Sequence, residues 1–161
     1  MVVRRWQVDD AGTTYNEREE TVDYIVGSGA HTRSYLYRTE SGELFQMPVA
    51  WFTVTQSWGI HPGYDTAEHA GFNRPITRDC IACHTSYPTA PVGSDMLGQP
   101  HIYPENLPLG IGCQRCHGPG AAHVEIANDP NATVESILAT VVRISELDPE
   151  RRNDVCLQCH M

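Results

Sequence analysis

Cysteine and histidine recur together three times in this sequence, always in the pattern Cys-x-x-Cys-His. The three copies take up all six cysteines. On a helical turn, residues three and four positions apart share a face, so each copy would present two thiols and an imidazole together. That arrangement suits a covalently attached haem, with thioether bonds from the cysteines and the histidine under the iron. The copies are Cys80/Cys83/His84, Cys113/Cys116/His117 and Cys156/Cys159/His160.

Other uses of paired cysteines explain this pattern less well. A chain of this composition would contain roughly 0.01 such motifs by chance. A structural zinc ion takes four ligands, and three pairs with an adjacent histidine each do not divide neatly into such sites. Thioredoxin-like pairs and simple disulfides do not need a histidine directly after every pair. The sequence therefore favours three c-type haems over these alternatives.

The histidines outside the motifs are candidates for the second axial position on each iron. Five such residues for three irons is a surplus, so all three haems can be ligated by two histidines. His123 follows His117 by six residues, close enough to reach a neighbouring haem. His31 ends a Gly-rich turn that could approach a flat cofactor closely. For the others we expect one or two ligands, with a surface position as the alternative for each: His61, His69 and His101.

The elements that must position these residues fall into two kinds, which makes the expected fold class α+β. Stretches rich in β-branched and aromatic residues predict a strand-rich region over residues 1–60. A Glu-Ser-Gly turn at 40–42 should join two of its strands as a hairpin. This region has no cysteine and so carries no haem of its own. The expected strands are Val2–Val8, Thr21–Val26, Arg33–Thr39, Glu43–Met47 and Ala50–Ser57.

The remainder, residues 61–161, is predicted to consist of loops and short helices organised around the three haems. Proline and glycine are frequent over 61–112, which favours long loops around a cofactor. We expect one domain over residues 1–161, in which 1–60 is the haem-free part and 61–161 the attachment part. The expected helices cover Asp79–His84, Cys113–Ile126 with a bend at 118–120, and a stretch that begins at the N-cap Asp148 and runs into Cys159-His160.

Charge and hydropathy limit the partners. The formal net charge is −9, and all 11 basic residues are arginine. So acidic a chain should repel nucleic acid, and we expect redox proteins as partners instead. No apolar run reaches the ~18 residues of a membrane span. Since c-type haems are attached outside the cytoplasm, the motifs predict a periplasmic or extracellular protein, its signal peptide removed or the chain part of a longer one.

One segment resembles a known family. Gly112–His123 (GCQRCHGPGAAH) is similar to a motif of the bacterial multihaem cytochrome c superfamily, which includes pentahaem nitrite reductase, octahaem hydroxylamine oxidoreductase and the tetrahaem shuttle of ammonia oxidisers. The resemblance implies that His123 ligates a neighbouring haem. Gly27–Leu36, Pro75–His84 and Arg151–His160 are further similar to uncharacterised multihaem cytochromes, some fused to tetratricopeptide repeats. The nitrite reductases use a Lys-ligated catalytic haem, and this chain has no lysine.

These features favour electron transfer by a trihaem cytochrome with bis-histidine irons, and not an enzyme. Two alternatives stay open. The chain could be a subunit of an extracellular cytochrome filament, a homopolymer in which haems continue across subunit interfaces. It could instead be a haem enzyme with one open iron that acts on a small nitrogen or sulfur compound.

Overall fold

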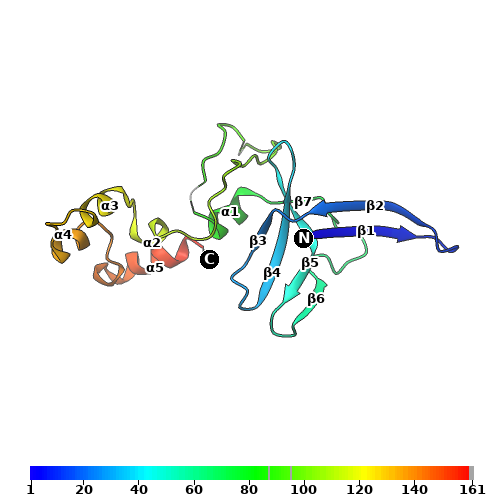
Figure 1. The fold of residues 1–161 in the computed structure, drawn as a ribbon, viewed down its shortest axis with the longest axis horizontal. Helices are drawn as coiled ribbons and strands as arrows, with labels where there is room; N and C mark the ends of the chain where they lie inside the picture. The colour runs from blue at the N-terminus through cyan, green and yellow to red at the C-terminus, as the bar shows by residue number, and fades with distance from the viewer. Residues whose placement is uncertain (87, 95, 160–161) are drawn as a thin grey trace. The chain divides into compact units, whose positions relative to one another are not determined.

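The computed structural model describes residues 1–86, 88–94 and 96–159, and the chain divides into two compact units (Figure 1). Unit 1 comprises Met1–Arg78 and Thr89–Glu105, and unit 2 comprises Asp79–Pro88 and Asn106–Met161. Strands build unit 1 and short helices build unit 2, which confirms the α+β class. Residues 61–78 belong to the strand-rich unit, so the division lies later than the expected boundary at residue 60. The single domain over 1–161 stays a prediction.

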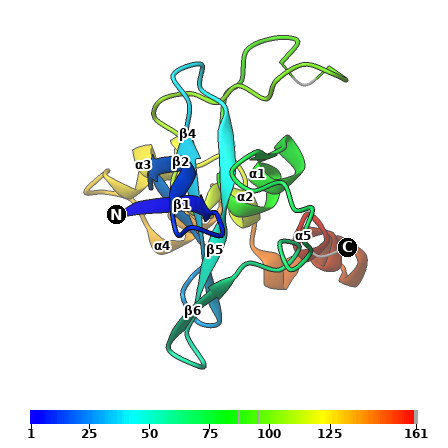
Figure 2. The same ribbon diagram turned by 90° about the vertical axis from the view of Figure 1, so that its right-hand side faces the viewer.

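Unit 1 contains two antiparallel sheets. The smaller pairs β1 with β2, and the larger has the order β3-β4-β5-β6, with β7 also pairing with β5. The long central strands of the larger sheet, β4 and β5, run together through the view of Figure 2. The strands are β1 (Val2–Val8), β2 (Thr14–Thr21), β3 (Tyr24–Val26), β4 (Thr32–Arg38), β5 (Leu44–Phe52), β6 (Ser57–Ile60) and β7 (Arg74–Pro75).

The hairpin predicted around residues 40–42 is present between β4 and β5. The Thr39 amide donates to the Glu43 carbonyl over 3.0 Å and closes the turn. Gly42 has a φ of 92°, in the left-handed region that favours glycine. The turn residues therefore set the register of the central strand pair.

Two other strand predictions differ from the structure. The prediction of one strand over Ala50–Ser57 was wrong, because the chain turns between Phe52 and Ser57. The Thr53 hydroxyl donates to the Gly29 carbonyl over 2.7 Å, a side-chain bond to the backbone that competes with strand pairing. The strand predicted over Thr21–Val26 is confined to Tyr24–Val26.

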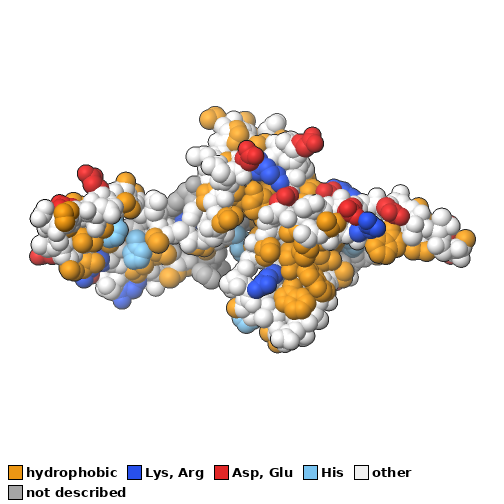
Figure 3. Space-filling model, viewed as in Figure 1, with side chains coloured by type: hydrophobic (Ala, Val, Ile, Leu, Met, Phe, Trp, Pro, Cys, Tyr) orange, Lys and Arg blue, Asp and Glu red, His pale blue; other side chains and the backbone are white. Residues whose placement is uncertain are grey.

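Strand β2 was not expected, because glutamates are poor strand formers. Cross-strand charge pairs stabilise it instead. Arg4 lies opposite Glu19 in the register, and their side chains form an ion pair at 2.5 Å. Figure 3 shows arginine and acidic side chains alternating along this hairpin.

The hydrophobic core of unit 1 packs between the sheet and the loop after β6. Its central cluster consists of Tyr35, Tyr37, Met47 and Phe72. The Tyr37 hydroxyl donates to the Phe72 carbonyl over 2.7 Å, which ties the loop to the sheet. Burial raises the pKa of Tyr37, and the nearby Arg18 guanidinium opposes that rise. Unit 1 thus buries side chains from most of its strands without a cofactor.

We expect the substitution Met47→Ala to lower the free energy of unfolding of unit 1 by about 2–5 kcal/mol, because it leaves a cavity at a fully buried site. Met96→Ala is the matched control, since the Met96 side chain is 66 % exposed, and should change stability by less than about 0.5 kcal/mol. Urea titration followed by far-ultraviolet circular dichroism measures both. Equal losses in the two variants would contradict this account of the core.

The helices of unit 2 are short. Two expected features are confirmed: the Asp148 side chain caps a helix by accepting from the Arg151 amide, and the chain breaks at 118–120, where Gly118 has a φ of 75°. The last helix ends at Leu157, earlier than expected, and His160 lies outside the described residues. The helices are α1 (Arg78–His84), α2 (Gln114–His117), α3 (Ala121–Ala127), α4 (Val134–Leu138), the 3₁₀ helix η1 (Ile144–Glu146) and α5 (Pro149–Leu157).

Unit 2 differs from unit 1 in where its apolar side chains lie. Within the described part of the chain, no residue of α2, α3, α4 or α5 is buried. Val124, Val134 and Leu157 are each more than half exposed. None of the described helices has the length and apolar composition to cross a membrane. The helical unit therefore presents apolar surface that its own side chains leave uncovered.

Candidate haem-binding site

Each Cys-x-x-Cys-His motif lies on or beside a short helix of unit 2. Helix α1 carries the whole first motif, α2 begins directly after Cys113, and α5 carries Cys156 just before its end. The six cysteines are free thiols, and the two of each motif differ in the same way. The first cysteine is exposed and the second half-buried in every copy: Cys80 and Cys83, Cys113 and Cys116, Cys156 and Cys159.

The first and third motifs contact each other. The Cys83 thiol lies 3.9 Å from the Gln158 carbonyl oxygen and 4.0 Å from that of Cys159, within the range of S–H···O bonds. Burial, followed by the interaction with Cys159, raises the pKa of the Cys83 thiol. Motifs far apart in the sequence thus come together in unit 2.

The second motif joins this contact through the residues between its cysteines. Arg115 Nε donates to the Thr85 carbonyl, next to the first motif, over 3.3 Å. The Arg115 carbonyl in turn accepts from Gln158 Nε2, in the third motif, over 2.9 Å. Together with the Cys83 contacts, these bonds link the three motifs in a closed cycle. Attachment sites that are separate in the sequence form one cluster.

The His117 imidazole is oriented as an iron ligand would be. Its Nδ1 lies 2.9 Å from the Val142 carbonyl oxygen. A carbonyl only accepts, so Nδ1 carries the hydrogen and Nε2 of the neutral ring has a free lone pair. The Val142 amide also donates to the His117 carbonyl over 3.0 Å, so two bonds fix this residue. Such a bond on the second nitrogen is typical of metal-ligating histidines.

His123 on α3 has the same arrangement. Its Nδ1 lies 3.1 Å from Thr140 Oγ1 and 3.3 Å from the Ile137 carbonyl oxygen. The Thr140 hydroxyl donates to that carbonyl over 2.6 Å, which leaves its oxygen free to accept from the imidazole. Nε2 of His123 is again left with its lone pair. The segment after α4 thus orients both His117 and His123.

Because Thr140 accepts from His123, we expect Thr140→Val to disturb the ligand field of one iron without removing a haem. Loss of the acceptor lowers the basicity of the imidazole, so the potential of that haem should rise and its low-spin electron paramagnetic resonance signal should shift. Thr140→Ser keeps the hydroxyl and should restore both values. An unchanged spectrum in Thr140→Val would show that His123 does not ligate iron.

Two histidines of unit 1 use their ring nitrogens within the protein. His61 Nδ1 donates to the Pro62 carbonyl, and its Nε2 accepts from Gln46 and Ser34, all at 2.8 Å. His69 Nδ1 accepts from the Gly71 amide over 3.0 Å, so its neutral ring carries a hydrogen on Nε2. Ligation by Nε2 of His61 would break two bonds, and ligation by Nε2 of His69 would require the other tautomer. Their predicted role as ligands stays a prediction.

The remaining candidates lie in different settings. His31 in the β3–β4 loop and His84 at the end of α1 are exposed. His101 is half-buried, and its Nδ1 has no hydrogen-bond partner in the part of the chain that the structure describes. His160, the predicted ligand of the third motif, falls outside the described residues. Of the five spare histidines, His123 alone belongs to the unit that carries the motifs.

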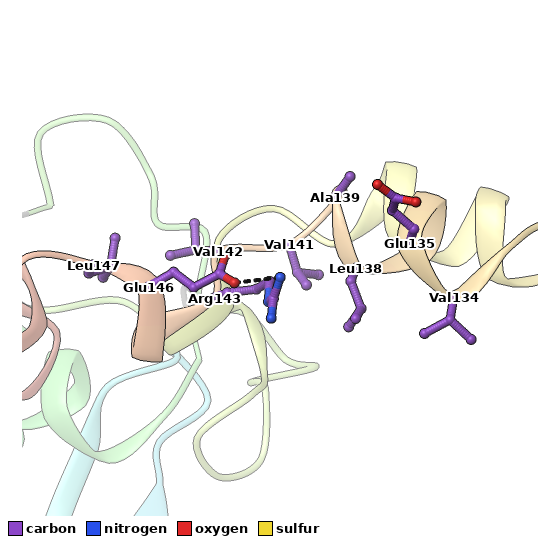
Figure 4. Close-up of a pocket in the computed structure, with 9 residues that line it drawn as sticks. All are labelled: Val134, Glu135, Leu138, Ala139, Val141, Val142, Arg143, Glu146 and Leu147. Atoms are coloured by element: carbon purple, nitrogen blue, oxygen red, sulfur yellow. Dashed lines mark ion pairs between the residues drawn. The ribbon is translucent and has the colours of Figure 1, made fainter.

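A shallow apolar groove of about 820 Å³ runs along unit 2 beside these ligand candidates (Figure 4). It includes Val142, whose carbonyl orients His117. Its polar rim holds the ion pair between Arg143 and Glu146, at 2.5 Å. The lining residues are Val134, Glu135, Leu138, Ala139, Val141, Val142, Arg143, Glu146 and Leu147.

The donor set of unit 2 fits haem better than a protein-bound metal ion. Among residues 1–86, 88–94 and 96–159, no three His, Cys, Asp or Glu side chains gather as metal ligands. The thiols instead lie in pairs on separate helices, each beside one imidazole. Uncovered apolar side chains surround them, as a porphyrin would require.

Comparison with known proteins gives one informative result. No family model matches the chain, and no curated protein matches it. The crystal structure of the outer cell wall cytochrome OcwA superimposes with a TM-score of 0.52 and 20 % sequence identity. This chain has a cytochrome-like fold. The match covers 88 % of this chain and 26 % of OcwA, so the chain spans about a quarter of that protein's length.

Proposed function

We propose that the chain is an electron-transfer cytochrome that binds three c-type haems covalently in unit 2. The proposal depends above all on three linked motifs in a unit whose helices α2 to α5 bury no described residue. Porphyrins supply large, flat apolar surface and would cover the exposed side chains of these helices. The cytochrome-like fold supports the same conclusion.

Each side chain has a definite task in this proposal. When bound, the haems supply iron that changes between ferric and ferrous forms, and burial and ligation set the potentials. The six cysteines hold the porphyrins, and the motif histidines His84, His117 and His160 occupy one axial position each. His123 ligates a neighbouring haem, held by Thr140 and Ile137. His31, His61, His69 and His101 are candidates for the remaining axial positions.

The setting follows from the same observations. OcwA is a cytochrome of the outer cell wall, and the likeness to it supports a position at the cell surface or outside the cell for this chain as well. Its partners would be other redox proteins. The acidic composition favours partners with basic surfaces.

A haem count combined with a redox titration tests the function. The intact chain should give three haems per polypeptide in the pyridine haemochrome assay, all reducible and none binding carbon monoxide. The double variant Cys80→Ala/Cys83→Ala should give two, because it removes one attachment site. Fewer than three haems in the intact chain, or haem that cannot be reduced, would refute the proposal. Carbon monoxide binding by the intact chain would reveal an open iron and favour an enzyme.

A further inference from the structure

The variable residues inside the motifs are not equivalent. In the second and third motifs, the residue just before the second cysteine bonds to another motif: these are Arg115 and Gln158. The residues just after the first cysteine, Gln114 and Leu157, are exposed. Attachment chemistry itself requires only the cysteines and the histidine, so the bonds of Arg115 and Gln158 serve something other than attachment.

We infer that Arg115 and Gln158 are positioning residues that fix the mutual orientation of the three haems. This inference rests on the proposed function. A haem held by two thioethers and one imidazole of a short helix is fixed to that helix at three points. Turning the helix therefore turns the porphyrin plane. Bonds between motif helices consequently set the angle between one haem and the next.

Only part of the hydrogen-bonded cycle persists after haem attachment. The Cys83 contacts to the Gln158 and Cys159 carbonyls need the S–H group, which is lost when the thioether forms. The bonds donated by Arg115 and Gln158 involve no thiol and remain possible. In the haem-loaded protein these two side chains therefore connect the motifs.

The surroundings of these two bonds suit a positioning role. Thr85, whose carbonyl accepts from Arg115, is only 6 % exposed, so the acceptor lies on a buried part of the backbone. The donor is a guanidinium, and a charged donor makes a stronger bond than a neutral one. Gln158 Nε2 also donates to the Val155 carbonyl over 3.0 Å, which holds its amide in place on α5. Both donors are thus held at the position from which they reach the next motif.

Haem orientation can be read from the circular dichroism of the Soret band. Transitions of neighbouring haems couple, and the sign and amplitude of the resulting couplet depend on the distance and angle between the porphyrin planes. A side chain that merely stabilises the fold lowers the melting temperature when it is replaced but leaves this couplet unchanged below the transition. The couplet therefore separates positioning from stability.

The test compares Gln158→Glu with Gln114→Glu in the haem-loaded full chain. Both make the same chemical change between two motif cysteines, but only Gln158→Glu removes a donor between motifs and places a carboxylate against the Arg115 carbonyl. We expect the Soret couplet of Gln158→Glu to lose amplitude or change shape and that of Gln114→Glu to match the parent. Melting temperature and haem count are recorded for all three proteins.

The outcomes separate this inference from the proposed function. Three reducible haems with an unaltered couplet in Gln158→Glu would overturn the positioning role and leave the function intact. Fewer than three haems in the parent would refute the function. Should Gln158→Glu fail to accumulate, Arg115→Lys gives a second test, since it keeps the charge but lacks the Nε–H donor to Thr85. An unchanged couplet in that variant would equally overturn the inference.

Discussion

A chain made without haem attachment will lose its helical structure and keep its strands. The helices of unit 2 are at most 9 residues long, shorter than the ~12–15 residues at which isolated helices become even marginally stable. Since α2 to α5 bury no described residue, side-chain packing cannot compensate. Unit 1 has its own core around Met47 and Phe72. Removing the haems should therefore unfold unit 2 alone.

Far-ultraviolet circular dichroism and limited proteolysis measure this difference. The haem-free protein is made by replacing all six cysteines with serine, and the haem-loaded parent is the control. We expect the helical signal to disappear and cleavage to concentrate within residues 106–159, with the strand signal retained. Native helical content in the haem-free chain would show that unit 2 does not need the cofactor.

Replacement of His123 with glycine will open one iron to external ligands. With the imidazole gone, the haem that it ligates should become high-spin in the oxidised protein and bind carbon monoxide when reduced. Added imidazole should restore the low-spin spectrum, because the vacated space can accept the free base. His123→Met should keep the iron low-spin and raise its potential by on the order of 0.1 V, within the ~0.8 V range that axial ligands span.

His61 provides the matched comparison for this experiment. Both of its ring nitrogens are already hydrogen-bonded within unit 1. We expect His61→Gly to destabilise unit 1 while all irons stay low-spin. Carbon monoxide binding in His61→Gly, or none in His123→Gly, would reverse the assignment of the two residues.

Local signals in the sequence predicted those elements that local interactions form. The strand Val2–Val8, the turn before Glu43 and the helix capped by Asp148 each depend on residues close in sequence. Strand β2 escaped prediction because its stability comes from charges on the opposite strand. Helix α4 was also missed, although the Thr133 and Ser136 side chains form a capping box that marks its start.

The site divides in the same way. The spacing of cysteine and histidine predicts attachment, because the chemistry occurs within one helical turn. The Nδ1 partners of His117 and His123 could not be predicted, since Val142 and Thr140 lie beyond a loop and another helix. The bonds of Arg115 and Gln158 join residues 30 and 43 positions apart, and no pattern within either motif indicates them.

The contact between Cys83 and Cys159 joins residues 76 positions apart, which gives the protein a timetable. Synthesis begins at the N-terminus and proceeds at about 5–20 residues per second, so the first motif exists for several seconds before the third is made. During that interval no part of α5 can cover Cys83, and its thiol stays open to the attachment machinery. Once Cys159 has been added, the first and third motifs can shield each other. Maturation thus has a window that the order of synthesis itself closes.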